Sequence, residues 1–328
     1  MTNHFWGIDV GGTNVKLGLL DDEGRIIVQD SVPTESAQGP DSLVERIGTT
    51  CEQLQQQAGI NDQAVIAVGI GTPGPLSLEK GMIYRAGNLP GFDNYPLRGR
   101  ISARLNRPAI LDNDANVIGW GEHYQGAGKG FDNMVVLTLG TGVGGGIVYD
   151  GEILHGSEDN GAELGHMVIH PEGRKCNCGQ NGCLEAYASA THMVRRAKEA
   201  LDLGRDSKLK QSAAEGSLDT RAIFEHTHTG DELANEIVDG ACKALAYASI
   251  TLRHILEPRL IVLGGGVAKA GDILTERTEK YYLEELWQLK PDPMEFRLAQ
   301  LGDNAGVVGG AGLAWHAWKN DRLAPIGI

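Results

Sequence analysis

The chain has 328 residues, of which 41% are hydrophobic, 22% are charged and only 5% are aromatic. This is the composition of a soluble globular protein, and the length is sufficient for two domains of ordinary size. Asp and Glu outnumber Lys and Arg by 43 to 29, and the resulting net charge of −14 would repel a polyanion, which excludes nucleic acid as an expected partner. Glycine is the unusual component, because its 46 residues are about twice the usual share of about 7%.

Neither export nor membrane insertion is expected. The first residues show no basic segment followed by an apolar one, and the longest uncharged stretch, residues 133–149, is too rich in glycine and threonine to span a membrane. Three of the five cysteines fall within eight residues, which argues against a secreted disulfide framework. We therefore expect a cytoplasmic protein with a metal site and no membrane partner.

The first part of the chain alternates short apolar strands with turns and one helix. Apolar residues at helical spacing predict that helix over residues 41–58, with Asp41 or Ser42 as N-cap and Gly59 as its end. Strands before and after a helix are typical of an α/β domain. The predicted strands cover residues 5–10, 15–20, 25–32, 64–68 and 109–111.

The second part restarts this pattern at residues 133–149, where an apolar strand, a glycine-rich turn and another apolar strand follow one another. This weak internal repeat predicts two related domains. Further on, the spacing predicts a long helix over residues 231–256 and a strand over residues 260–263 that leads into a third glycine cluster. The polar, aperiodic residues 201–217 are expected to form a surface insertion.

Glycine clusters follow three predicted strands, near Gly11, Gly142 and Gly265. Any one of them could be a tight hairpin, but together they favour phosphate binding, because glycine lets backbone N–H groups approach a phosphate closely. The hydroxyls of Thr13 and Thr141 would add donors. Neither a dinucleotide fold nor a P-loop is indicated: the two G-x-G-x-x-G matches do not open helices, and no G-x-x-x-x-G-K-[ST] segment occurs.

One histidine and three cysteines have the spacing of a metal site, His166-x9-Cys176-x-Cys178-x4-Cys183. One imidazole and three thiolates make a complete tetrahedral set, which favours a structural zinc ion over buried thiols that merely cluster. Cys51 and Cys242 lie on apolar helix faces and are expected in the core.

Asp114 follows a predicted strand and precedes a predicted helix over residues 117–124. Two interpretations stay open from the residues alone. The carboxylate and its Asn neighbours can simply cap the helix, or Asp114 can act as a general base that takes a proton from a hydroxyl attacking a phosphate.

Several motifs together resemble the ROK family of sugar kinases and sugar-responsive repressors. The resemblance runs from end to end and implies an α/β protein with the actin-like, hexokinase-type ATPase fold (ribonuclease H-like), with two duplicated domains and a nucleotide and sugar cleft between them. It implies an N-terminal domain of residues 1–115 plus about 305–328, and a larger domain of residues 116–304 that carries the zinc loop. The motifs are residues 9–14 (DVGGTN) followed by Lys16, then 113–116 (NDAN), 140–146 (GTGVGGG), 163–166 (ELGH) and 176–185 (CNCGQNGCLE).

The resemblance also implies residue roles. Asp114 would be the catalytic base, and the sugar would be bound by Asn113 and Asp114, by Asn88 in the segment 86–92, and by Glu163, His166 and Glu185. Zinc held by His166 would fix the tautomer that this side chain presents to the sugar. Asp9 would be a water-mediated partner of Mg²⁺, and Gly265 and Gly266 would lie near the adenosine. The phosphates would be held by Gly11, Gly12, Thr13, Lys16, Thr141, Gly142 and Gly144.

The expected activity is ATP-dependent phosphorylation of the 6-hydroxyl of a hexose, glucose first, with Mg²⁺ as cofactor and a homodimer as the assembly. A kinase for N-acetylglucosamine, N-acetylmannosamine or fructose is the alternative within the class. A repressor of this family is disfavoured, since no helix-turn-helix segment is found ahead of Gly11 and Asp114 is retained. Asn14, Lys16 and the short His166-x9-Cys176 spacing resemble the glucokinase branch.

Overall fold

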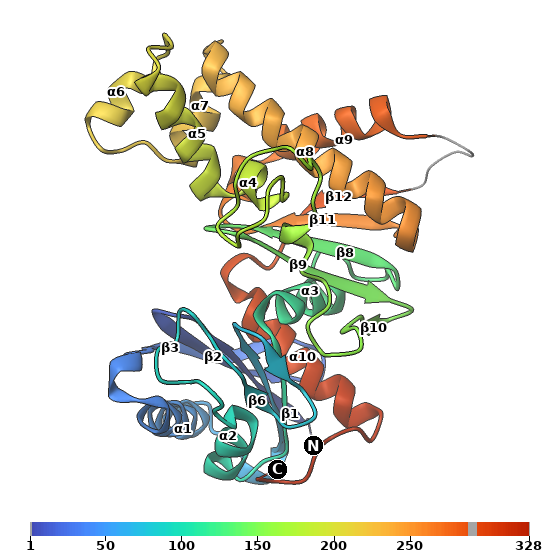
Figure 1. The fold of residues 1–328 in the computed structure, drawn as a ribbon. Coiled ribbons are helices and arrows are strands. Elements are labelled where there is room, and N and C mark those ends of the chain that lie inside the picture. The colour runs from blue at the N-terminus through green and yellow to red at the C-terminus, as the bar shows by residue number, and fades with distance from the viewer. Residues whose placement is uncertain (1, 288–293, 328) are drawn as a thin grey trace. The chain divides into compact units, whose positions relative to one another are not determined.

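The computed structural model describes residues 2–287 and 294–327, and these divide into two compact units. Unit 1 comprises Met1–Asp132, Gly146–Ala162 and Gln300–Ile328; unit 2 comprises Asn133–Gly145 and Glu163–Ala299. Figure 1 shows their strands and helices along the chain.

The first five-stranded sheet has the order β3-β2-β1-β4-β7. Strand β1 pairs antiparallel with β2 and parallel with β4, and β4 pairs parallel with β7. All five predicted strands of this half are confirmed, although the observed β4 and β7 run further toward their carboxyl ends. Their bounds are β1 His4–Val10, β2 Asn14–Asp21, β3 Ile26–Pro33, β4 Val65–Thr72 and β7 Ala109–Asn113.

The second five-stranded sheet has the order β10-β9-β8-β11-β12, which repeats the order of the first sheet element by element. The predicted strands over residues 133–139, 147–149 and 260–263 are confirmed as β8, β9 and β11. A repeated strand order is what a duplicated α/β domain produces, so the weak sequence repeat has a structural counterpart. The bounds are β8 Met134–Leu139, β9 Val143–Tyr149, β10 Glu152–Ile153, β11 Leu260–Gly264 and β12 Glu295–Leu298.

Helix α1 (Pro40–Gln57) buries the face formed by Leu43, Ile47, Cys51 and Leu54, as its spacing predicts. Its predicted N-cap is wrong. Gly39 is the cap residue and Pro40 occupies the first turn, where proline's fixed φ suits a helix and its missing N–H costs nothing.

Helix α3 (Asp114–Gln125) packs against α10 (Ala305–Lys319), and α10 also covers β1 and β4. Close approach requires glycine here: a Cβ at Gly7 would overlap the Val307 carbonyl, and one at Gly69 would overlap the Gly310 carbonyl. Because α3 packs on α10, it clusters with unit 1, whereas the predicted domain boundary falls after residue 115. Unit 1 also contains α2 (Leu97–Leu105) and the small hairpin of β5 (Leu76–Ser77) and β6 (Met82–Ile83).

Glu122 on α3 is a fully buried carboxylate that ties two distant segments of unit 1 together. It accepts hydrogen bonds from the backbone N–H groups of Ala127 (2.9 Å), Gln300 (3.1 Å) and Leu301 (2.9 Å). We expect Glu122→Ala to destabilise the protein by about 3 kcal/mol, since three N–H donors lose their acceptor at roughly 1 kcal/mol each. Urea unfolding should measure this, with Glu279→Ala on an exposed helix position as the control. A loss for Glu122→Ala no larger than that of the control would contradict this account.

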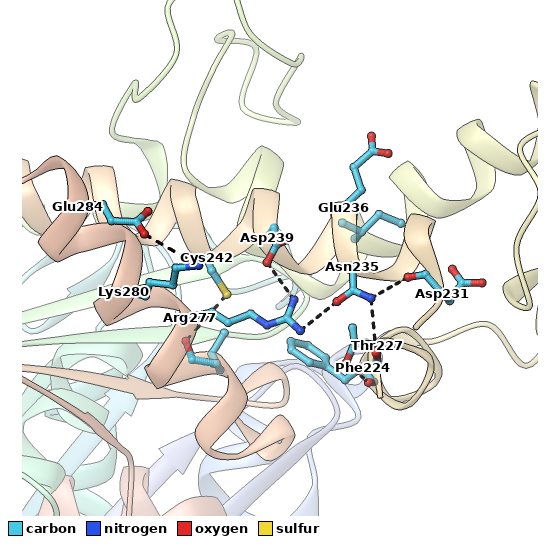
Figure 2. Close-up of polar contacts among 12 residues, drawn as sticks. Phe224, Thr227, Asp231, Asn235, Glu236, Asp239, Cys242, Arg277, Lys280 and Glu284 are labelled. Carbon is cyan, nitrogen blue, oxygen red and sulfur yellow. Dashed lines mark hydrogen bonds and ion pairs between the residues drawn. The ribbon is translucent and has the colours of Figure 1, made fainter. Parts of the chain in front are cut away.

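The longest helix of unit 2 among the described residues is α8 (Glu232–Leu256), which confirms the helix predicted over residues 231–256, and the Asp231 side chain caps it. In Figure 2, Arg277 of α9 donates to Asp239 (2.9 Å) and Asn235 (3.0 Å) of α8, so the two helices are fixed side by side. The expected surface insertion is partly helical, because it includes α6, whose Leu209 is buried. The remaining helices are α4 Glu185–Ala188, α5 Ala190–Asp202, α6 Leu209–Ala214, α7 Thr220–Thr227 and α9 Asp272–Glu285.

Short 3-10 helices complete the secondary structure: η1 Ser36–Gln38, η2 Asp62–Ala64, η3 Leu164–His166, η4 Val267–Ala270 and η5 Gly302–Asn304. Among the described residues, no helix combines the length and the apolar character needed to cross a membrane. Cys51 and Cys242 are buried, as predicted.

Candidate active site and metal centre

Asp114 is the first residue of α3 and follows β7 directly. The side chain of Asn113 caps the helix by accepting from Ala115 N–H at 2.9 Å, so the capping interpretation holds for Asn113. Burial raises the pKa of the Asp114 carboxyl above its ordinary value, although nearby backbone N–H groups and Asn113 act in the opposite sense. A carboxylate with a raised pKa is a better proton acceptor than one with an ordinary pKa, which suits a general base.

Asp9 lies near the end of β1, close enough to Asp114 for their charges to interact. Burial and then the charge of Asp114 raise the pKa of Asp9 from 3.8 to about 6, while Lys16 acts in the opposite sense. Helix α10 makes room for this carboxylate, because a Cβ at Gly306 would overlap it. The structure therefore brings two of the predicted site residues, Asp9 and Asp114, to one place in unit 1.

Lys16 lies opposite Asp9 in the antiparallel register of β1 and β2. Its ammonium group donates to the Asp303 backbone carbonyl at 2.8 Å, next to the start of α10. The Lys16 side chain is 40% exposed. The predicted phosphate ligand is thus held toward α10 in this structure.

The turn between β1 and β2 contains Gly11, Gly12 and Thr13. Its first hydrogen bond runs from Gly11 N–H to the Asn14 carbonyl at 3.0 Å. A Cβ at Gly12 would lie 3.2 Å from the Asn88 carbonyl oxygen, so the structure also brings the predicted sugar residue Asn88 beside this turn. Neither glycine has a positive φ, and close approach is therefore the reason for glycine here.

In unit 2, the glycine-rich turn between β8 and β9 contacts Glu185. Val143 N–H donates to Glu185 at 3.0 Å, and a Cβ at Gly142 would lie 2.5 Å from the same carboxylate. The predicted sugar ligand Glu185 is therefore positioned by the turn that is predicted to hold phosphate. Thr141 in that turn is exposed, and Gly144 continues into β9.

The segment with Glu163, Gly165 and His166 packs against the same strand. A Cβ at Gly165 would overlap the Val143 carbonyl, which explains glycine at that position. The 3-10 helix η3 ends at His166, whose N–H donates to the Glu163 carbonyl at 3.0 Å. The side chain of Glu163 is exposed.

The four predicted metal ligands lie together. The ligand atoms of His166, Cys176, Cys178 and Cys183 are all within 4.8 Å of one another. Burial raises the pKa of Cys183 to about 12, whereas a backbone hydrogen bond from Gln180 helps to lower that of Cys178 to about 7. One nitrogen and three sulfur atoms at this separation fit a tetrahedral metal ion such as zinc. Cys176 also lies 3.5 Å from Glu185, so this cluster adjoins the predicted sugar ligand.

Gly265 and Gly266 follow β11. Gly265 has φ +81°, and a Cβ there would lie 2.5 Å from the Leu139 carbonyl. Gly266 opens onto a cavity of about 510 Å³ within unit 2 that η4 and α7 also line. Arg221 and Phe224 of α7 and His228, which caps its C-terminal end, were not predicted as site residues.

Two further residues near Asp114 were missed by sequence reasoning. The buried Asp112 receives a hydrogen bond from the His155 ring at 2.7 Å. Asp112 belongs to the predicted strand-to-helix junction, but nothing in the sequence spacing connects it with His155.

The chain is similar in sequence and in structure to several known proteins. The ROK family profile matches residues 5–317. A protein of Halalkalibacterium halodurans named glucokinase is 38% identical over 94% of this chain and 93% of its own length. The crystal structure of a ROK hexokinase from Thermus thermophilus superposes with a TM-score of 0.82 at 33% identity, covering 98% of this chain and 100% of the other. The crystal structure of a ROK family glucokinase from Streptomyces griseus, in complex with glucose and AMPPNP, superposes with a TM-score of 0.76 at 30% identity. The match covers 96% of this chain and 100% of the other.

The repeated sheets and these neighbours define the actin-like, hexokinase-type ATPase fold. The chain belongs to the ROK family.

Proposed function

We propose that this protein catalyses ATP-dependent phosphorylation of the 6-hydroxyl of glucose. The observation that carries the proposal is Asp114, a half-buried carboxylate with a raised pKa at the start of α3, in the NDAN motif. Similarity to proteins named glucokinase supports glucose as the substrate.

Asp114 would accept the proton of the sugar hydroxyl as its oxygen attacks the γ-phosphorus of ATP in line, and ADP would leave with the transferred bond pair. The other hydroxyls of the sugar would be bound and oriented by Asn88, Asn113, Glu163, His166 and Glu185. Carboxylates suit this task because each one can accept from two hydroxyl groups.

The phosphates of ATP would be bound by the two glycine-rich turns. These turns contain Gly11, Gly12 and Thr13 in unit 1 and Thr141 and Gly142 in unit 2. Gly144 in β9 and the cation of Lys16 would add to them. The adenosine would lie beside Gly265 and Gly266, where the cavity of about 510 Å³ supports the proposal. Mg²⁺, when bound, would neutralise charge on the phosphates, and Asp9 would hold it through water.

A structural zinc ion would be held by His166, Cys176, Cys178 and Cys183. The donor set and the separation of its atoms fit zinc and leave no open coordination position. The second ring nitrogen of His166 would then face the sugar in a fixed tautomer. A homodimer in the cytoplasm is proposed from the family resemblance, and sedimentation analysis of the purified protein tests the dimer.

A coupled assay of ADP formation tests the proposed activity directly. We expect kcat/KM for glucose to exceed the values for mannose, fructose, N-acetylglucosamine and N-acetylmannosamine. A higher kcat/KM for one of the other sugars would reassign the substrate within the same chemistry. No turnover with any of them would contradict the proposal.

Gly142→Val should damage both substrate sites. The added side chain would push against Glu185 and would cover the N–H groups of the turn, and a displacement of about 1 Å can lower kcat/KM by about 10²-fold. We expect this loss together with an unchanged zinc content, measured by steady-state kinetics and metal analysis. Gly140→Ala is the matched comparison, because its methyl group would meet nothing within 4 Å, and its effect should be far smaller. Equal effects of the two variants would count against the assigned role of Gly142.

A further inference from the structure

We propose that His155 is a positioning residue for the general base, a role that rests on the proposed function. His155 lies just after β10 in unit 1, and its Nε2 is 2.7 Å from Oδ2 of Asp112. Asp112 is the penultimate residue of β7, two residues before Asp114, and its side chain is only 4% exposed. A buried carboxylate needs a partner of opposite charge, and His155 supplies one.

The other oxygen of Asp112 fixes the junction between β7 and α3. Oδ1 accepts from the backbone N–H of Asn113 at 2.7 Å and from Nδ2 of Asn116 at 3.0 Å. Asn113 caps the helix and Asn116 lies in its first turn, on either side of Asp114. The orientation of the Asp112 carboxylate therefore sets where the Asp114 backbone lies, and His155 sets the orientation of that carboxylate.

His155 also anchors the loop formed by residues 154–162. Its backbone carbonyl accepts from Gly161 N–H at 2.8 Å, which folds the loop back on itself. Two side chains of this loop then accept from the backbone around β5: Asn160 from Leu76 N–H at 3.2 Å and Asp159 from Leu78 N–H at 2.9 Å. The residue that follows the loop in the chain is Glu163, a proposed sugar ligand. One side chain thus connects the base-bearing turn with the segment that leads to a substrate ligand.

The charges around His155 favour its protonated form. Burial lowers its pKa, but the hydrogen bond and charge of Asp112, together with the charges of Asp159 and Glu152, outweigh burial and raise the pKa above 6.5. The charged pair is therefore complete below the ordinary histidine pKa and weakens as pH rises through the raised value. We therefore expect kcat to fall at alkaline pH as His155 loses its proton.

The test compares His155→Ala with His155→Gln by steady-state kinetics with glucose and ATP. The alanine variant should lose about 10- to 100-fold in kcat, because the turn that bears Asp114 is no longer fixed. Its KM for ATP should stay within about twofold, since no atom of this pair is proposed to touch nucleotide. The glutamine variant keeps an N–H donor and should recover most of the loss at neutral pH, but without the alkaline decline that the wild-type protein shows.

His316→Gln is the matched control, because His316 forms a similar pair with Glu152 at 3.1 Å in the same unit and does not contact Asp112. Its kcat should equal that of the wild-type protein, and thermal melts would compare the folding of all variants. A His155→Ala kcat within about twofold of wild type would overturn this inference alone. Equal losses in the alanine and glutamine variants, with matching losses in stability, would overturn it in favour of a purely structural role. A wild-type protein without hexose turnover would overturn the proposed function and this inference with it.

Discussion

Asp114→Asn is expected to lower kcat for glucose phosphorylation by about 10²- to 10⁴-fold, the usual contribution of a positioned general base. The amide has nearly the shape of the carboxylate but cannot accept the hydroxyl proton. Its position at the start of α3 leaves the Asn113 cap and the Asp112 contacts in place. The KM values for glucose and ATP should therefore change much less than kcat, and steady-state kinetics would measure both.

The pH profile gives the same assignment a second readout. Because Asp114 must be deprotonated to act, kcat/KM should fall as pH is lowered through its raised pKa, at a pH above the 3.8 of an ordinary aspartate. Burial and the charge of Asp114 raise the pKa of Asp9 to about 6, so the loss of the Asp9 charge should contribute to the same fall in kcat/KM at acidic pH.

Asp206→Asn, at an exposed position of unit 2, is the control for a change of one charge and should retain wild-type kinetics. An Asp114→Asn protein that keeps more than a few per cent of wild-type turnover would remove Asp114 from the role of base.

Features encoded by neighbouring residues could be predicted from the sequence. Alternating and apolar runs give the five strands of the first sheet and β8, β9 and β11 of the second, but not β10 or β12. The spacing of Leu43, Ile47, Cys51 and Leu54 gives α1. The metal ligands could also be predicted, because three of the four lie within eight residues and the chemistry of the donor set is specific. In each case the information lies within one short segment of the chain.

Contacts between distant segments could not be predicted. His155 and Asp112 are 43 residues apart, and no periodicity joins them. Glu122 accepts a hydrogen bond from the N–H group of Gln300, which lies 178 residues further along the chain. The residues around Glu122 in the sequence are those of an ordinary helix. The α7 residues of the cavity are likewise brought to Gly266 only by folding. Pairings of this kind depend on tertiary packing, which a single sequence does not display.

Glycine required both sources of information. The sequence indicates that Gly12 and Gly142 matter, since glycine clusters follow strands. It does not show whether glycine is needed there for a positive φ or for the close approach of another group. The structure separates these two reasons: Gly265 has a positive φ, whereas Gly12 lies against Asn88 and Gly142 against Glu185. The turns therefore serve as contact surfaces for predicted sugar residues as well as sources of N–H groups.

Cys183→Ser is expected to remove the proposed zinc ion and to weaken sugar binding with it. Cys183 is fully buried and supplies one of four ligands, and a site with one fewer thiolate binds zinc far more weakly. Metal analysis should fall from about one zinc per chain to nearly none. The KM for glucose should rise by about 10- to 100-fold, because His166 and Glu185 lose the support that orients them.

The expected rise in KM follows from the short distance, in sequence and in space, between the proposed metal ligands and the proposed sugar ligand Glu185. Glu185 is two residues from Cys183, accepts from Val143 N–H, and lies 3.5 Å from the Cys176 sulfur. Loosening the cysteine loop would therefore move a proposed sugar ligand directly, whereas the proposed adenosine cavity beside Gly266 is lined by other segments of unit 2 and should keep its affinity for ADP. Cys242→Ala, at a buried cysteine of α8 outside the cluster, is the matched control and should keep its zinc. A Cys183→Ser protein with full zinc content, or one without zinc whose KM for glucose is unchanged, would contradict the proposed link between metal and sugar.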